Sequence, residues 1–204
     1  MLKAIAQAPA TTRERILDAA FETLRRHGFA RTSARAIART GGFNQALIFY
    51  HFGAVTDLLL AALDRVSVSR MERYREVLGA ASSLPDLPPL ARRLYMEDVE
   101  CGHATVLAEL FAASSGNASL RDEMLKRMRP WVDFTESLIE RFTDGTPFGS
   151  LVNPHAAAGA LLAMYVGLDL LTNLDGDRAR VTKMFDAADR AAQTLAPLMT
   201  GFTK

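Results

Sequence analysis

Apolar residues recur every three to four positions along most of the chain, which is the spacing of helices that bury one face. The first such stretch begins at a capping box, in which Thr11 is followed three residues later by Glu14. Runs of β-branched residues are scarce, and glycines and prolines cluster at a few breaks. The pattern predicts an all-α protein of about nine helices without internal repeats.

The breaks set the limits of the later helices. Segment 82–89 is the clearest linker, because its proline density does not continue a helix. Asn153 and Pro154 are typical of an N-cap followed by a first helical residue, and Pro130 is expected to bend a long helix. Beyond residue 55, the expected helices cover residues 56–80, 90–102, 103–115, 120–142, 154–173 and 177–198.

Residues 32–52 carry the densest local signals in the chain. Ser33 is placed to cap a short helix, and Asn44 is placed to cap a second one. Ala38 and Gly42 lie four residues apart between them. A sharp turn between helices needs a small residue where the backbones touch and a glycine where φ is positive. The segment therefore predicts a helix-turn-helix whose second helix reads DNA.

The block from about Thr12 to Leu60 resembles the N-terminal domain of the TetR (tetracycline-repressor-like) family of transcriptional regulators. The two share the order of three helices and the run Ile48-Phe49-Tyr50-His51-Phe52-Gly53 before a long apolar helix. Beyond residue 60, only the layout of the helices supports the match. The resemblance implies a regulator, most often a repressor, that a small molecule releases from its operator. It predicts a flexible arm over residues 1–11, a DNA-binding domain over 12–53 and an effector-binding and dimerisation domain over 54–204.

Six side chains around the second helix are the candidate DNA contacts. Asn44 and Gln45 can bond adenine edges or phosphates, or they can serve as caps and solvated groups. Leu47 is expected either to meet a thymine methyl or to be partly buried. Tyr50 and His51 can donate to phosphates, and an arginine on the preceding helix adds attraction. The set is Arg35, Asn44, Gln45, Leu47, Tyr50 and His51.

Two sites depart from the family pattern. Phe49 stands where the family usually has a tyrosine, and it has no hydroxyl to donate to a phosphate. Ala54 and Val55 stand where the long helix often begins with Ser-Lys, so a cap and a positive charge are missing. Each neutralised phosphate contributes a slope of about −0.9 to the salt dependence of binding, so we expect a shallower dependence.

Charge and composition agree with a DNA-binding head. Residues 1–52 hold eight basic and three acidic residues, whereas the 204-residue chain has a net charge of +1. No apolar run approaches the roughly 20 residues that span a bilayer, so no membrane partner is expected. Residues 1–10 are too short and broken for a secretory signal. The single Cys101 excludes an internal disulfide and fits a reducing cytoplasm.

The resemblance also implies an effector site in the C-terminal part. Methionine and aromatic side chains there combine flexible sulfur and ring surface with a few polar tips, as an apolar ligand site requires. Fewer than half are expected to touch a ligand, and the others are expected to be core. Glu100 and Asp169 are considered as groups that orient a polar part of the ligand. The candidates are Met96, His103, Leu107, Phe111, Met128, Trp131, Phe134, Met164, Tyr165 and Leu168.

Small residues on the last two expected helices predict a homodimer. Such residues let helices approach closely, so two helices from each copy can form a two-fold symmetric interface; tight packing within one chain is the alternative. A dimer places two recognition helices about 34 Å apart or more, so a palindromic operator is expected. The candidate interface residues are Ala156, Gly159, Ala160, Ala163, Gly167, Ala188, Ala191 and Leu195.

Catalytic patterns are weak. Glu100 and His103 have the Glu-x-x-His spacing of helical di-iron proteins, but those proteins need two such motifs and two further glutamates. The histidines and Cys101 form no metal-ligand set by spacing, so no enzyme activity, metal or cofactor is expected. Two alternatives stay open: a helical ligand-binding protein or enzyme with a vestigial DNA-binding head, and a protein that coats DNA without reading its sequence.

Overall fold

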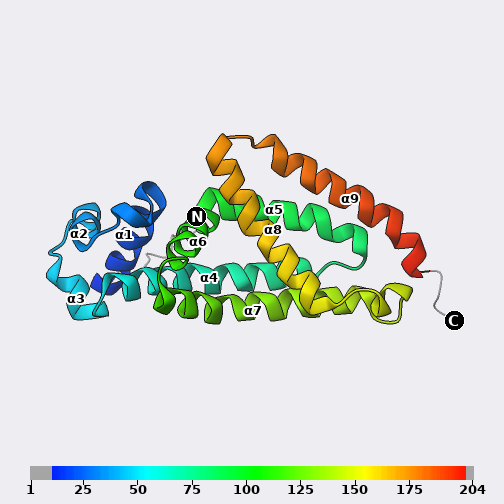
Figure 1. Ribbon diagram of the computed structural model, residues 1–204, viewed down its shortest axis with the longest axis horizontal. Helices are drawn as coiled ribbons and strands as arrows, with labels where there is room; N and C mark the ends of the chain where they lie inside the picture. The colour runs from blue at the N-terminus through cyan, green and yellow to red at the C-terminus, as the bar shows by residue number, and fades with distance from the viewer. Residues whose placement is uncertain (1–10, 201–204) are drawn as a thin grey trace, which may run out of the picture. The chain divides into compact units, whose positions relative to one another are not determined.

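The computed structural model describes residues 11–200, and within them nine α-helices and three short 3-10 helices form the regular structure (Figure 1). The chain divides into two compact units, up to Arg65 and from Val66 onward. This division falls later than the sequence-based boundary after residue 53, because the start of α4 (Val55–Gly79) buries Leu58 and Leu63 in the first unit. The expected flexible arm lies, apart from Thr11, outside the described residues.

The first unit is a three-helix head to which the start of α4 is added. Its helices are α1 (Thr12–His27), α2 (Ala34–Gly41) and α3 (Ala46–Phe52), with a 3-10 helix at Phe29–Arg31 between α1 and α2. The capping box is confirmed: the Glu14 amide donates to Thr11 Oγ1 at 3.2 Å, and the Thr11 amide donates to Glu14 Oε2 at 2.7 Å. Ile16, Ile37 and Ile48 are fully buried, so each of the three helices contributes to one core.

The second unit is a helical bundle that includes the rest of α4. Helix α7 packs against α6 and α8, and α5 packs against α6 and α9. Buried Val77, Leu78 and Leu94 join α4 to α5, and Phe134 and Leu138 of α7 pack against them. The helices are α5 (Leu87–Cys101), α6 (His103–Ser114), α7 (Ala118–Thr143), α8 (Pro154–Asp175) and α9 (Ala179–Thr200), with 3-10 helices at Leu84–Asp86 and Pro147–Ser150.

The proline-rich linker is shorter than the sequence indicated. Residues Leu84–Asp86 form a 3-10 helix, and α5 begins at Leu87. Pro88 and Pro89 therefore occupy the first turn of a helix, where the N–H group that proline lacks has no intrahelical partner. The predicted start of α8 is confirmed, because Asn153 Oδ1 accepts from the Ala156 amide at 2.9 Å.

Helix α8 is unusually apolar for an exposed helix. By length and composition alone it is able to cross a membrane, with a mean hydropathy of 1.5 over 18 residues, which is weak evidence for a span. The expectation that no apolar run approaches the length of a membrane span was therefore wrong, because alanines and leucines keep the mean hydropathy of this continuous helix high. Only 17% of that window is buried inside the chain. A long apolar face left outside the core indicates an interaction surface.

Candidate DNA interface and ligand cavity

The turn between α2 and α3 has the predicted geometry with one addition. Ser33 Oγ accepts from the Ala36 amide at 3.2 Å, and Gly42 has a φ of 66° in the left-handed region. The tightest approach, however, is at Gly41. A Cβ there would lie 2.8 Å from Ala19 Cβ of α1 and closer still to the Phe43 ring. The requirement for a small residue, expected at Ala38, thus applies also at Gly41, which the sequence pattern did not indicate.

Helix α3 begins at Ala46, two residues after the predicted cap. Asn44 nevertheless stabilises its start, because Asn44 Oδ1 accepts from the Ala46 amide at 2.9 Å. A bidentate contact to adenine uses both the oxygen and the nitrogen of an amide side chain. Asn44 Oδ1 is thus already engaged by the backbone, whereas its NH2 group makes no hydrogen bond within residues 11–200. Gln45 is exposed and forms no side-chain hydrogen bond to any residue within 11–200, so both of its polar atoms are free.

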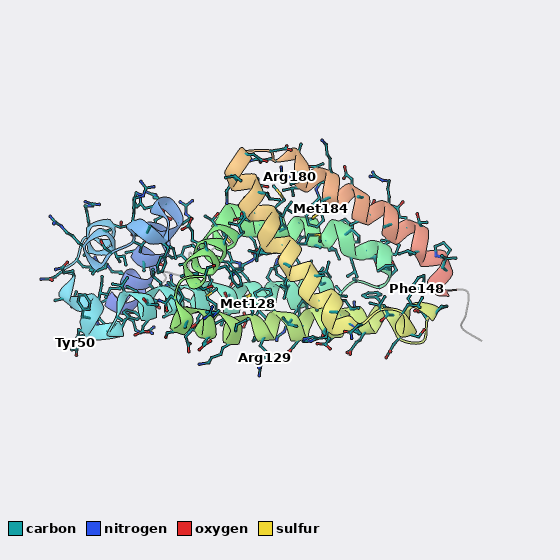
Figure 2. All side chains as sticks on the ribbon, viewed as in Figure 1. Tyr50, Met128, Arg129, Phe148, Arg180 and Met184 are labelled. Atoms are coloured by element: carbon teal, nitrogen blue, oxygen red, sulfur yellow. The ribbon has the colours of Figure 1, made fainter. Side chains whose placement is uncertain are left out.

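The aromatic end of α3 separates buried from exposed groups. Tyr50 has 83% of its surface exposed and projects outward from α3 (Figure 2). His51 is half-buried, with its ring edge-on to Tyr50 at 5.0 Å between centroids. Leu47 is half-buried too, while the Arg13 guanidinium lies 4.9 Å from the centre of the Phe52 ring. The Tyr50 hydroxyl is thus the most accessible donor at this end of the helix.

Two arginines of α2 carry charge that the head does not neutralise. Arg35 and Arg39 are exposed and make no ion pair with the part of the chain that the structure describes. Some other arginines of the head are paired with carboxylates, as Arg25 is with Glu22 at 2.8 Å and Arg65 is with Asp18. Unpaired cations beside exposed polar groups of α3 form a surface suited to phosphates.

The second unit contains a cavity of about 380 Å³, within the usual range of about 300–1,000 Å³ for small-molecule sites. Its wall is almost entirely apolar and comes from α4 to α9. In Figure 2, Met128 points from α7 toward the other helices of the bundle, whereas Arg129 points away from them. Eight of the candidate ligand residues line this cavity: His103, Leu107, Met128, Trp131, Phe134, Met164, Tyr165 and Leu168.

Two of the candidate ligand residues, Met96 and Phe111, do not line the cavity. Met96 follows Tyr95 on α5, about 100° further around the helix, and its side chain is 41% exposed. Phe111 lies one turn beyond Leu107 on α6, where the cavity no longer reaches that helix. Of the two acids considered, Glu100 is exposed. Asp169 is buried but away from the wall, and it accepts from Asn173 Nδ2 at 2.9 Å.

The acid that does reach the cavity is Asp98, which sequence analysis missed. It is 1% exposed, and its Oδ1 accepts from Arg70 Nε in a buried ion pair. The hydroxyls of Tyr74 and Tyr165 donate to Asp98 Oδ2 at 2.7 and 2.8 Å. Burial and this carboxylate raise the pKa of both tyrosines well above the usual range, so they stay protonated as donors. Asp98 therefore joins α4, α5 and α8 at the polar end of an apolar cavity.

His103 is buried beside this cluster. Its Nε2 lies 3.1 Å from Ser67 Oγ, while its Nδ1 has no hydrogen-bond partner and lies 3.8 Å from Asp98 Oδ1. Burial lowers the pKa of His103, so the ring is neutral at pH 7. Gly102 takes a φ of 80° between α5 and α6, so Glu100 and His103 do not share a helix face. Within residues 11–200, no three His, Cys, Asp or Glu side chains are grouped to hold a metal ion.

A three-helix head in which α3, the second helix of the helix-turn-helix, is exposed defines a helix-turn-helix DNA-binding protein. The second unit adds an apolar cavity. The family model described as bacterial regulatory proteins, tetR family, matches residues 16–62. This match covers the head and the start of α4. The head and the start of α4 thus match the DNA-binding domain of this family.

Relatives agree with this assignment. The chain is similar to the HTH-type transcriptional regulatory protein RaaS of Mycobacterium tuberculosis, with 31% identity over 59% of this chain and 53% of that protein. The chain spans about half the length of the curated relatives it matches. Two solved structures share the fold. The fatty acid degradation regulator FadR of Bacillus halodurans has a TM-score of 0.75 and 15% identity, and the match covers 96% of this chain and 98% of that one. FadR of Bacillus subtilis in complex with stearoyl-CoA has a TM-score of 0.70 and 16% identity, and the match covers 93% of this chain and 98% of that one.

Proposed function

We propose that this protein is a ligand-responsive transcriptional regulator, and specifically a repressor that leaves its operator when a small molecule fills the cavity. The proposal rests on the difference between the two units. One unit has exposed, unpaired polar and basic groups on α2 and α3, and the other has an apolar cavity with a polar end. Neither unit needs a catalytic group for this role, and the site of action is DNA in the cytoplasm.

The exposed groups of the head divide into two kinds of DNA contact. Gln45, with both polar atoms free, is the residue that reads a base edge. Asn44, Tyr50 and His51 donate to phosphates, and Arg35 adds charge. Leu47 is only half-buried, so it can still reach a thymine methyl from the same helix.

A homodimer presents two such heads to one operator. Six of the eight proposed interface residues, five alanines and Gly159, are exposed on α8 and α9. The exposed apolar side chains Leu161 and Leu171 of α8 add to that surface. Leu195 of α9 is also exposed, while Gly167 is half-buried. Covering this surface with a second copy buries apolar area that the single chain leaves in water. Two-fold symmetry then implies a palindromic operator.

Release follows from a shift between two conformations. The effector prefers the one whose recognition helices are wrongly spaced for adjacent major grooves. The FadR of Bacillus subtilis, which shares this fold, binds stearoyl-CoA, and this supports a ligand-binding role for the second unit. A typical coupling of about 1–3 kcal/mol would loosen operator binding about 5–150-fold.

The direct test is to sequence the genomic fragments that the purified protein retains, and then to measure affinity for the enriched duplex. We expect Gln45→Ala to weaken binding by about 1–3 kcal/mol, since it removes a base contact. Gln193→Ala on α9 is the matched control, because Gln193 is also exposed and lies in the second unit. Equal affinity for a scrambled duplex at the same salt concentration would indicate a DNA-coating protein. Ligand binding without any enriched fragment would favour a ligand-binding protein with a vestigial head.

A further inference from the structure

Two residues that line the cavity each have a buried polar atom without a partner among the described residues. Tyr95 Oη and His103 Nδ1 are buried, and neither has a hydrogen-bond partner among the described residues. A buried polar atom left unsatisfied costs about 1–3 kcal/mol. Both atoms therefore gain if a ligand supplies the missing partner.

The other polar groups of the wall are already engaged. Asp98 accepts from Arg70, Tyr74 and Tyr165. The hydroxyl of Thr135 donates to the Trp131 carbonyl at 2.8 Å, and that of Thr143 donates to the Ile139 carbonyl at 3.0 Å. The wall thus offers hydrogen bonds to a ligand mainly through Tyr95 and His103.

The charges around the wall disfavour an anion. Among the described residues that line the cavity there is no lysine or arginine, and Asp98 is the charged side chain present. The nearby Arg70 is bound to Asp98 and Glu97. Asp169 is also buried, and its charge acts on Tyr95. A carboxylate in the cavity would be desolvated beside like charges, which is costly without a cationic partner.

The hydrogen atoms at these two sites are arranged to donate. The negative Asp98 Oδ1 at 3.8 Å from His103 Nδ1 favours the tautomer with its proton on that nitrogen, and Ser67 Oγ then donates to Nε2. Tyr95 keeps its proton, since burial and the nearby Asp169 and Asp98 raise its pKa to about 12.

Taking the cavity as the effector site of the proposed function, we propose that its ligand is an uncharged, largely apolar molecule with a carbonyl-type acceptor. The acceptor receives a hydrogen bond from the Tyr95 hydroxyl, from His103 Nδ1–H, or from both. The apolar part lies against the wall, where Trp131 and Phe134 provide aromatic surface. Free fatty carboxylates are excluded by the charge of the wall.

Trp131 provides a readout of the cavity that is independent of DNA, because it is the one tryptophan of the chain and lies in the wall. We would titrate the full-length protein at pH 7 with four probes that share one linear alkyl chain: a methyl ketone, a carboxylate, an amine and the plain alkane. We expect the ketone to change the fluorescence with the highest affinity. The carboxylate should bind at least about tenfold more weakly, which corresponds to about 1.4 kcal/mol.

Two variants test the hydrogen bond. Tyr95→Phe keeps the ring but removes the hydroxyl, and it should weaken ketone binding about 2–10-fold while leaving alkane binding unchanged. Met96→Leu, at the neighbouring outward position, should change neither affinity. A carboxylate or amine that binds as tightly as the ketone overturns the proposal, and so does the failure of every probe to bind.

The failure of this inference is distinguishable from that of the proposed function. Ketone binding that does not release the operator would contradict the repressor mechanism but leave the ligand class standing. Operator release by the carboxylate would contradict the ligand class and leave the regulator standing.

Discussion

The two units of this protein treat their polar groups in opposite ways. The head leaves Gln45, Arg35 and Arg39 without partners at its surface. The second unit buries Asp98 and satisfies it with Arg70 and two tyrosine hydroxyls. Free polar groups serve a partner that arrives with its own charges and hydrogen bonds, whereas buried ones must be paired inside the fold. Under the proposed function, the difference separates residues that contact DNA from residues that stabilise the fold and line an apolar ligand site.

The largest expected effect concerns Asp98. Asp98→Ala should destabilise the second unit by about 3–5 kcal/mol, because it leaves Arg70 with a buried charge and two tyrosine donors without an acceptor. Urea unfolding followed by Trp131 fluorescence measures this loss. Glu97→Ala is the matched control, since Glu97 also pairs with Arg70 but is partly exposed, and it should cost about 0–1 kcal/mol. Equal losses in the two variants would contradict the special role of the buried carboxylate.

The next effect concerns the exposed apolar surface of α8. Ala163→Arg places a charge in the proposed dimer interface and should raise the dimer dissociation constant about a hundredfold, or about 2.7 kcal/mol. Light scattering after size exclusion gives the mass over a concentration series. Leu125→Arg on α7, another exposed apolar position, should leave the mass unchanged. A dimer that survives Ala163→Arg would place the interface elsewhere.

A smaller effect is expected in the head. Gly41→Ala should cost about 1–3 kcal/mol, because the added Cβ meets Ala19 and the Phe43 ring. Operator affinity and helical circular dichroism should fall, while the Trp131 transition of the second unit should stay in place. Gly116→Ala has open space around its Cβ and is the control. A Trp131 transition shifted as far as the head signal would mean that the two units unfold together.

The smallest effect is a dependence on pH. Burial lowers the pKa of His103 below its ordinary 6.5, so the folded state binds fewer protons than the unfolded chain. The contribution of a neutral His103 is complete above about pH 6.5 and declines as pH falls below it. Urea midpoints between pH 7.5 and 5 should therefore decrease with acidification, and His103→Gln should flatten the slope. His27→Gln in the head, used as the control, should leave the slope of the urea midpoint against pH unchanged.

The head could be predicted closely from the sequence because its signals are local. The caps at Thr11 and Ser33 and the positive φ of Gly42 depend on residues within one turn, and all three are confirmed. The α3 start was displaced because Asn44 accepts from the amide two residues on rather than three. Gly41 was missed since its constraint comes from Ala19, which lies in a different helix.

The cavity was predicted less completely. Residue type alone identified most of the apolar wall, but it does not distinguish Tyr95 from Met96, which differ by rotation around α5. Asp98 was missed because an acid in mid-helix is usually solvated, and its partners come from α4 and α8. One signal was available in the sequence: Arg70 and Tyr74 are four residues apart and so share a helix face. Only the fold shows that this face meets Asp98.

Arg35 and Arg39 make no ion pair with the described part of the chain, so their attraction to phosphates depends on the salt concentration. Counterions compete for the same phosphates, and the screening length falls from about 10 Å at 0.1 M salt to about 3 Å at 1 M. Occupation of the cavity by an uncharged ligand involves no such competition. If the protein is the repressor proposed above, promoter occupancy would decline during osmotic stress, when dissolved ions become concentrated, while effector sensing continued unaltered. Hyperosmotic shock and effector would then both induce the same genes.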